Sequence, residues 1–388
     1  MASSRVLAIR HPLWLLAASL AVFLALDNGI FRSGLYGRFA NPDTLPAQVY
    51  NTVHFENLRH PTGKREIFLA GASTMHWAFW CKQYNDAHEN SGYAFVQGGI
   101  AGTNEEMWYY ILQAVDPHRS RYAAIVIPNA GYIVDSWHAD QANNYDDAQM
   151  LAPVLSLSEW PGVIESFQNP DLRWKAALLA AFPSHGYAAD LQDLILHPSL
   201  RAAKLQLRWR GGSFWLYDWP GTPGSMQDFL AGPGNGEVAN FPADLTSFER
   251  ANTIDEFTRP SPHQAAISTA RNAQFQSYWL NKIIARYAGS GTTLIFAQIP
   301  RWPMPLPARG PIPGAPDLRQ LLTHDDNTVF LPEDAFVSLE QPKYFYDTIH
   351  LNNVGRAIFT SLLGDQVLRV LETEGLEAQR NHQQRKTT

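Results

Sequence analysis

Short, continuous apolar runs alternate with amphipathic stretches along much of the chain. The runs that are typical of buried strands cover residues 66–70, 93–97, 122–127, 293–298 and 328–331. Amphipathic stretches at 104–115, 270–287 and 353–374 predict helices; in the second, Phe275, Trp279, Ile283 and Tyr287 recur every fourth residue. Continuous apolar strands that alternate with helices are typical of a parallel sheet covered on both faces. The pattern predicts an α/β fold, with a three-layer α/β/α arrangement around a mostly parallel, five-stranded sheet.

The N-terminus carries a separate hydrophobic signal. Arg5 and Arg10 precede an apolar run from Leu13 to Leu26. A run of this length after a positive flank predicts a signal anchor, with a cleaved signal peptide and a buried helix as the alternatives. With an anchor or a signal peptide, the positive flank stays in the cytoplasm and the chain from about residue 30 is exported.

These patterns divide the chain into five parts. We expect an N-terminal signal anchor at 1–31, a lead-in or stalk at 32–64, a sheet domain built from 65–135 and 268–374, an insertion at 136–267, and a polar tail at 375–388. The insertion is rich in Pro, Gly and Trp, and we expect it to be mainly helical or irregular, with a helical piece at 172–181.

Composition narrows the classes of partner and cofactor. The 388 residues carry a formal net charge of −6 and no dense basic stripe, which argues against a nucleic-acid partner. The single cysteine, Cys81, excludes an internal disulfide and a CxxC site. His138 and Asp140 resemble a metal pair but lack a third ligand at a sensible spacing, so we expect neither a metal nor a cofactor.

Polar residues follow the predicted strands at the positions where parallel sheets build their sites. Ser73 follows the first strand, Gly99 the second and Asn129 the third, and Asp347 and His350 lie together before the last helix. These residues are the parts that acyl transfer needs: a hydroxyl nucleophile, a base with its supporting carboxylate, and donors for an oxyanion. Each also has a structural reading, since a serine after a strand is often a helix cap and Gly98-Gly99 fits a tight turn.

The order of these motifs resembles the SGNH (GDSL-like) hydrolase family. Gly71-Ala72-Ser73 is similar to its nucleophile block, residues 97–102 (QGGIAG) to its second block, and residues 347–351 (DTIHL) to its last block. The resemblance covers residues 65–135 and 270–373 and implies a flavodoxin-like SGNH fold. It also implies Ser73 as nucleophile, His350 as base and Asp347 as its support, with an oxyanion hole formed by the N–H groups of Ser73 and Gly99 and by the Asn129 side chain.

Two positions depart from the family pattern. Ala72 replaces the usual aspartate of the first block, and Pro128-Asn129-Ala130-Gly131 stands where Gly-x-Asn-Asp is usual. These departures argue against a typical GDSL lipase and keep a non-catalytic protein of the same fold as an alternative. Met75 replaces the second glycine of Gly-x-Ser-x-Gly, which disfavours an α/β-hydrolase.

One N-terminal anchor followed by such a domain is similar to bacterial proteins of polysaccharide O-acetylation and teichoic-acid D-alanylation. This similarity implies an inner-membrane protein whose main domain lies in the periplasm or outside the cell. Its expected activity is that of a serine esterase or O-acyltransferase on acyl groups, acetyl above all, of an envelope or secreted polysaccharide. A membrane-bound acyltransferase is the partner that it implies, and the alternative is a module that binds glycan or that partner. Trp215, Trp219 and Arg301 are candidates for substrate binding, although the two tryptophans also fit a role in packing the insertion and Arg301 also fits a role in packing.

Overall fold

The chain folds into two compact units in this computed structural model. The structure describes residues 3–61, 63–128, 145–167, 169–209, 262–300, 318–345 and 350–387. The first unit comprises Met1–Leu58 with Gln141–Trp215, and the second comprises Arg59–Asp140 with Leu216–Thr388. Segments that are far apart in sequence therefore build each unit.

The second unit is built on a five-stranded sheet. Its strands are β1 (Arg65–Leu69), β2 (Tyr93–Gln97), β3 (Ala124–Pro128), β4 (Thr293–Ala297) and β5 (Thr328–Phe330). Their order is β2-β1-β3-β4-β5, and every neighbouring pair is parallel. The predicted α/β class with a central five-stranded sheet is confirmed.

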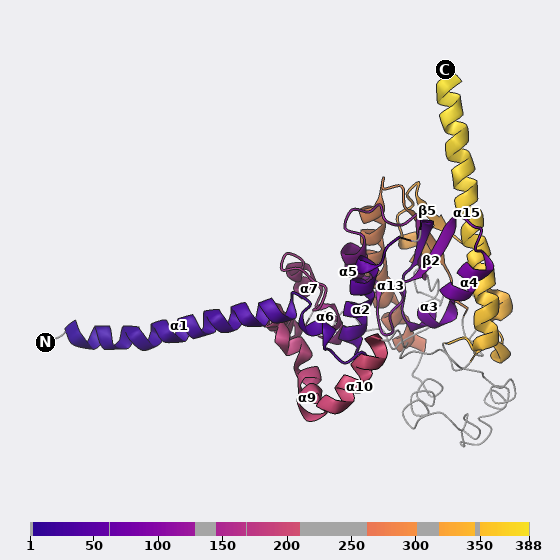
Figure 1. Ribbon diagram of the computed structural model, residues 1–388. Helices are drawn as coiled ribbons and strands as arrows, with labels where there is room; N and C mark the ends of the chain where they lie inside the picture. The colour runs from indigo at the N-terminus through magenta and orange to yellow at the C-terminus, as the bar shows by residue number, and fades with distance from the viewer. Residues whose placement is uncertain are drawn as a thin grey trace. The chain divides into compact units, whose positions relative to one another are not determined.

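Helices cover both faces of this sheet (Figure 1). On one face lie α3 (Ser73–Ala78), α4 (Cys81–Ala87) and α15 (Asn353–Thr387); on the other lie α5 (Glu105–Val115) and α13 (Pro262–Tyr287). The remaining pieces are α14 (Leu318–Leu321), η5 (Val337–Leu339) and η6 (Pro342–Tyr344). The fully buried strand residues Leu69, Val126 and Ile295 pack against Phe359 and Leu363 of α15. Because α15 covers the sheet, the residues that precede it are held close to the strands.

Local sequence explains the two helices on the opposite face. Asn104 caps α5 by accepting a hydrogen bond from the Met107 N–H at 3.1 Å, and two glutamates occupy the first turn, where the helix dipole favours negative charge. In α13 the predicted stripe buries Trp279, Ile283 and Tyr287. The helix α5 therefore forms where the apolar period predicts it, whereas α13 ends at the predicted Tyr287 but begins at Pro262, eight residues before the predicted start at residue 270.

The first unit is helical. It contains α1 (Ser3–Phe31), η1 (Tyr36–Arg38), α2 (Leu45–Leu58), α6 (Tyr145–Leu151), α7 (Trp160–Ser166), α8 (Pro170–Ala181), η4 (Pro183–Tyr187), α9 (Ala188–Leu196) and α10 (Pro198–Trp209). Within the part of the chain that the structure describes, one segment, Pro12–Phe31 of α1, is long and apolar enough to cross a membrane.

Three segments differ from the sequence-based expectation. The lead-in at 32–64 contains α2, whose buried Val49, Tyr50 and Val53 have helical spacing that the surrounding Gly, Pro and Asn residues obscure. The final helix runs to Thr387 and not to Glu374, because the polar tail is rich in Glu, Gln, Arg and Lys, which are good helix formers. Residues 141–215 of the expected insertion form one unit with the N-terminal segment.

Candidate active site

A sharp turn after β1 presents Ser73. Gly71 has φ +141°, and a Cβ atom at this position would lie 2.6 Å from the Met75 Cβ, so the turn requires glycine. Ser73 is the first residue of α3, and its N–H therefore belongs to the first turn of the helix, whose N–H groups have no partner within the helix. The turn thus places a hydroxyl and a backbone donor together at the carboxyl end of the sheet.

The Ser73 hydroxyl contacts an imidazole from the far end of the sequence. His350 Nε2 lies 3.0 Å from Ser73 Oγ, although the two residues are 277 positions apart. At this distance the two groups form a hydrogen bond, and in the tautomer with an unprotonated Nε2 the serine O–H is the donor. This is the geometry in which a histidine can take the proton of a serine nucleophile.

An aromatic side chain of α3 packs on this histidine. The rings of Trp77 and His350 meet edge to face, with centroids 4.4 Å apart and an interplanar angle of 68°. Ser73 and Trp77 are four residues apart and so lie on one face of the helix. One helical turn therefore supplies both the hydrogen-bond partner of the imidazole and the surface that limits its rotation.

Asn352, which is 1% exposed, anchors the segment that carries His350. Its Nδ2 donates to the carbonyls of Lys343 at 2.8 Å and Phe345 at 3.4 Å. Its Oδ1 accepts from the N–H groups of Val354 and Gly355 at 3.1 and 3.0 Å, which caps α15. A single amide thus ties the chain before His350 to the helix after it.

Two further contacts close the same segment. Phe345 and Leu351 form an isolated antiparallel bridge, so the chain on either side of residues 346–349 is paired. A Cβ atom on Gly355 would lie 2.3 Å from the Tyr344 carbonyl oxygen, and glycine is therefore needed for α15 to approach this chain closely. Both contacts fix the position of His350 relative to the sheet.

The loop after β2 is bound to α3 and to the turn after β1. The Gly71 carbonyl accepts from the Ile100 N–H at 2.9 Å and from Thr103 Oγ1 at 3.1 Å. The Gly99 N–H donates to Gln97 Oε1 at 2.9 Å, and the Gly99 carbonyl lies 2.7 Å from His76 Nδ1. Gly99 is therefore held close to α3, with its N–H directed at the Gln97 side chain.

His76, a second histidine near the site, lies on α3 about one turn beyond Ser73. Because a carbonyl oxygen only accepts, Nδ1 carries a proton and donates it to Gly99. Burial lowers the pKa of the His76 imidazole below its ordinary value, and the Arg356 guanidinium lowers it further, whereas the bond to Gly99 acts in the opposite direction. The net effect favours a neutral imidazole, in which the Nδ1–H group still donates to the Gly99 carbonyl.

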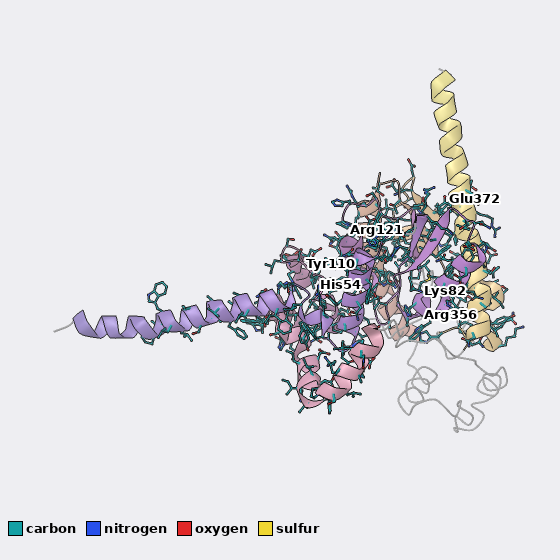
Figure 2. The ribbon with its side chains drawn as sticks, in the orientation of Figure 1. His54, Lys82, Tyr110, Arg121, Arg356 and Glu372 are labelled. Carbon is teal, nitrogen blue, oxygen red and sulfur yellow. The ribbon has the colours of Figure 1, made fainter. Side chains whose placement is uncertain are left out.

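Arg356 of α15 is the nearby cation. It is 9% exposed, and its guanidinium carbon lies 4.9 Å from the centroid of the Trp80 ring; Figure 2 labels it. This arrangement has the geometry of a cation–π contact and joins α15 to the chain between α3 and α4. The buried positive charge also raises the local potential beside His76, which is consistent with the direction of that pKa shift.

The structure brings together three of the residues predicted from sequence: Ser73, Gly99 and His350. Asp347, Asn129, Trp215, Trp219 and Arg301 lie outside the described residues, as do His138 and Asp140, and their roles stay predictions. Among the residues that the structure does describe, no group of three or more His, Cys, Asp or Glu side chains could hold a metal ion.

Four residues of the site were not predicted from sequence: His76, Trp77, Gln97 and Asn352. Trp77 and His76 carried a usable signal, because they follow Ser73 by four and three residues on a short helix. Gln97 and Asn352 carried none that would separate them from ordinary strand-end and cap residues.

Comparison with known proteins adds nothing to this geometry: no protein-family model matches the chain, and no curated protein matches it significantly. The functional argument therefore rests on the arrangement of the residues themselves.

Proposed function

We propose that this chain is an exported, membrane-tethered serine esterase or O-acyltransferase that acts on acyl groups, acetyl above all, of a cell-envelope or secreted polysaccharide. The observation that carries the proposal is the 3.0 Å contact between Ser73 Oγ and His350 Nε2. A serine and a histidine that meet at the carboxyl end of a parallel sheet are the nucleophile and base that ester chemistry requires.

In the proposed reaction, Ser73 Oγ attacks the ester carbonyl carbon and its proton passes to His350 Nε2. The C=O bond becomes a C–O⁻ bond, and the oxyanion is stabilised by the Ser73 N–H at the start of α3. The C–O⁻ bond then becomes C=O again as the bond to the leaving oxygen breaks, and His350 gives its proton to that oxygen. The alcohol departs, and the acyl group stays on Ser73 Oγ as an acyl-enzyme. A water molecule or a sugar hydroxyl resolves that ester by the same steps. By resemblance, Asp347 supports His350, and Gly99 and Asn129 complete the oxyanion hole.

The cellular setting of the proposal follows from α1. An apolar helix at Pro12–Phe31 after Arg5 and Arg10 fits a single anchor with its positive end in the cytoplasm. The rest of the chain then lies in the periplasm or outside the inner membrane, where polysaccharide substrates are present. A membrane-bound acyltransferase that supplies the acyl group fits the transferase version of the proposal.

Labelling with a fluorophosphonate, which reacts with activated serines, tests the proposal directly. We expect the full chain to be labelled and the Ser73→Ala and His350→Ala variants not to be. Ser277→Ala is the matched control, because Ser277 lies on α13 and its hydroxyl donates only to the Gln274 carbonyl among described groups. Absence of labelling in the folded wild-type chain would overturn the enzymatic proposal.

A second candidate is a non-catalytic module that binds glycan or an acyltransferase partner. The observation that favours it is the Gly99 N–H, which donates to Gln97 Oε1 at 2.9 Å and not toward Ser73. Two results together would support this candidate: fluorophosphonate does not label the folded wild-type chain, and the wild-type and Ser73→Ala chains bind an acetylated polysaccharide with the same affinity.

A further inference from the structure

The last turns of α1 are embedded in the first unit. Asp27 is 5% exposed and accepts a hydrogen bond from the Ser184 N–H at 3.3 Å. Asn28 Nδ2 donates to the Ala181 carbonyl at 3.1 Å, and Arg32 Nη2 donates to the Ala180 carbonyl. Asp27, Asn28 and Arg32, which follow the apolar run of α1, therefore each form a hydrogen bond with the corner between α8 and η4, residues 180–184.

This corner also contacts α1 well inside its apolar segment. The rings of Phe23 and Phe182 lie 6.0 Å apart. Phe23 precedes Phe31 by eight residues, which corresponds to about 12 Å along a helix. If Pro12–Phe31 crosses the hydrocarbon core, Phe182 must lie below the outer boundary of that core and not above the membrane.

Exposed apolar side chains are concentrated in the same unit. Among the described residues, the large apolar side chains that are exposed in the second unit are Trp80, Tyr278, Leu321 and Val354. The first unit, apart from α1, has Leu35, Phe39, Phe55, Leu58, Leu157, Trp174, Ile195, Leu196 and Leu200. Apolar surface of this kind, on a unit already joined to a membrane-spanning helix, marks a contact with lipid or with another chain.

Several of these side chains belong to segments fixed to the end of α1. Arg201 Nη1 donates to the Phe39 carbonyl at 2.9 Å, so Leu200 and Phe39 are carried by neighbouring segments. Phe31, the last residue of α1, has its ring 5.4 Å from that of Tyr187 in η4. Trp174, which is 66% exposed, shares a face of α8 with Leu178 and Ala181, next to the corner that holds Asn28.

We propose that the first unit sits in the outer interfacial layer of the bilayer, with the 180–184 corner around the end of α1 and Trp174, Phe39 and Leu200 in contact with lipid. This inference rests on the membrane anchor of the proposed function and adds that the first unit itself contacts the lipid. As a helix, Pro12–Phe31 is about 30 Å long and matches the roughly 30 Å hydrocarbon core, but its outer end carries the polar Asp27 and Asn28. The 180–184 corner binds these two side chains, and the exposed apolar side chains of the first unit face the lipid around them.

Fluorescence of an environment-sensitive label in the full chain tests whether the first unit contacts the lipid. In a Cys81→Ser background, single cysteines at Trp174→Cys and Leu200→Cys are labelled with nitrobenzoxadiazole, and the chain is reconstituted in phosphatidylcholine–phosphatidylglycerol vesicles. Leu20→Cys, within α1, is the lipid-facing control, and Lys82→Cys, on a side chain 79% exposed in the second unit, is the aqueous control. Lipid carrying a doxyl group near the headgroup serves as the quencher.

We expect labels at 174 and 200 to be quenched at least about twofold more than the label at 82, since interfacial side chains lie roughly 5–10 Å into the headgroup and acyl boundary. If the labels at 174 and 200 are quenched no more than the label at 82, the proposed contact of the first unit with lipid is wrong. A blue shift in the emission of these two labels without lipid quenching would indicate a contact with protein and would also contradict the proposed contact with lipid. If the label at 20 is not quenched, both the membrane anchor and the proposed contact of the first unit with lipid are wrong. If the labels at 174 and 200 are quenched by lipid but fluorophosphonate does not react with Ser73, the enzymatic proposal alone is wrong.

Discussion

The indole of Trp77 packs edge to face on the imidazole of His350, with ring centroids 4.4 Å apart. The contact comes from the same helix that carries Ser73, so α3 controls both the distance from Ser73 Oγ to Nε2 and the plane of the ring. The orientation of the imidazole is thus coupled to the position of the Ser73 hydroxyl.

Removal of either member of the pair should abolish turnover. Under the proposed function we expect kcat to fall by about 10⁴–10⁶ for Ser73→Ala and for His350→Ala, as in enzymes that use a serine and a histidine as a unit. The double variant should fall no further than the worse single variant, because the two groups act in one step. Ester hydrolysis and the melting temperature, measured together, check this; turnover that survives in a folded single variant contradicts the assigned role.

Trp77→Ala should lower activity without removing the nucleophile or the base. Loss of an aromatic pair costs about 0.5–1.5 kcal/mol beyond burial, which corresponds to a decrease in kcat of up to about tenfold if the imidazole is displaced. Trp77→Phe retains a ring and should recover most of the rate. The rate of fluorophosphonate labelling is the measurement, and equal rates in the Ala and wild-type chains would show that the ring contact does not position His350.

Asn352→Ala should reduce both stability and activity. The variant removes the amide that donates to the carbonyls of Lys343 and Phe345, and it removes the cap of α15, with an expected cost of about 1–3 kcal/mol in the free energy of unfolding. Asn169→Ala is the matched control: it removes the cap of α8, in which Asn169 Oδ1 accepts from the Asp171 N–H at 2.9 Å. It should cost about 0.5–2 kcal/mol and leave kcat unchanged.

Asn352→Asp separates the two functions of Asn352. An aspartate restores the acceptor for Val354 and Gly355 but not the donor for the two carbonyls. Stability should therefore recover in part, while kcat should stay low. If Asn352→Ala and Asn169→Ala have the same effect on kcat, the positioning role of Asn352 is wrong.

Gly355→Ala should destabilise the second unit, because the new Cβ would lie 2.3 Å from the Tyr344 carbonyl oxygen, a backbone atom that cannot rotate away. Overpacking of this kind costs about 1–3 kcal/mol. At Gly92 no atom lies within 4 Å of such a Cβ, so Gly92→Ala should leave chemical denaturation nearly unchanged. Equal denaturation midpoints for the two variants would contradict the close approach of α15.

His76 should make the free energy of unfolding depend on pH. Its pKa in the folded chain is lowered, chiefly by burial, from an ordinary value of 6.5. Between the two values the unfolded chain binds more protons than the folded chain, so stability is fully present above about pH 6.5 and decreases as the pH falls toward the folded pKa. His76→Gln should reduce the change in the free energy of unfolding over this pH range, as measured by urea unfolding at several pH values. If the pH dependence is unchanged in this variant, groups other than His76 cause it.

The sheet could be predicted because its strands are continuous apolar runs, and residues 93–97 were predicted with the bounds that the structure has. The order of the motifs also indicated that Ser73 and His350 would meet. Other features depend on contacts that no local pattern encodes. The helix α2 was missed because Pro, Gly and Asn residues surround it, and the bond from the Gly99 N–H to Gln97 Oε1 follows from a side-chain conformation, which sequence periodicity does not specify.

The separation of 277 positions between Ser73 and His350 has a consequence for biosynthesis. Synthesis proceeds from the N-terminus, so the Ser73 hydroxyl emerges from the ribosome well before the imidazole that it contacts. Under the proposed function, a chain terminated before residue 350 would contain the serine but could not attack an ester.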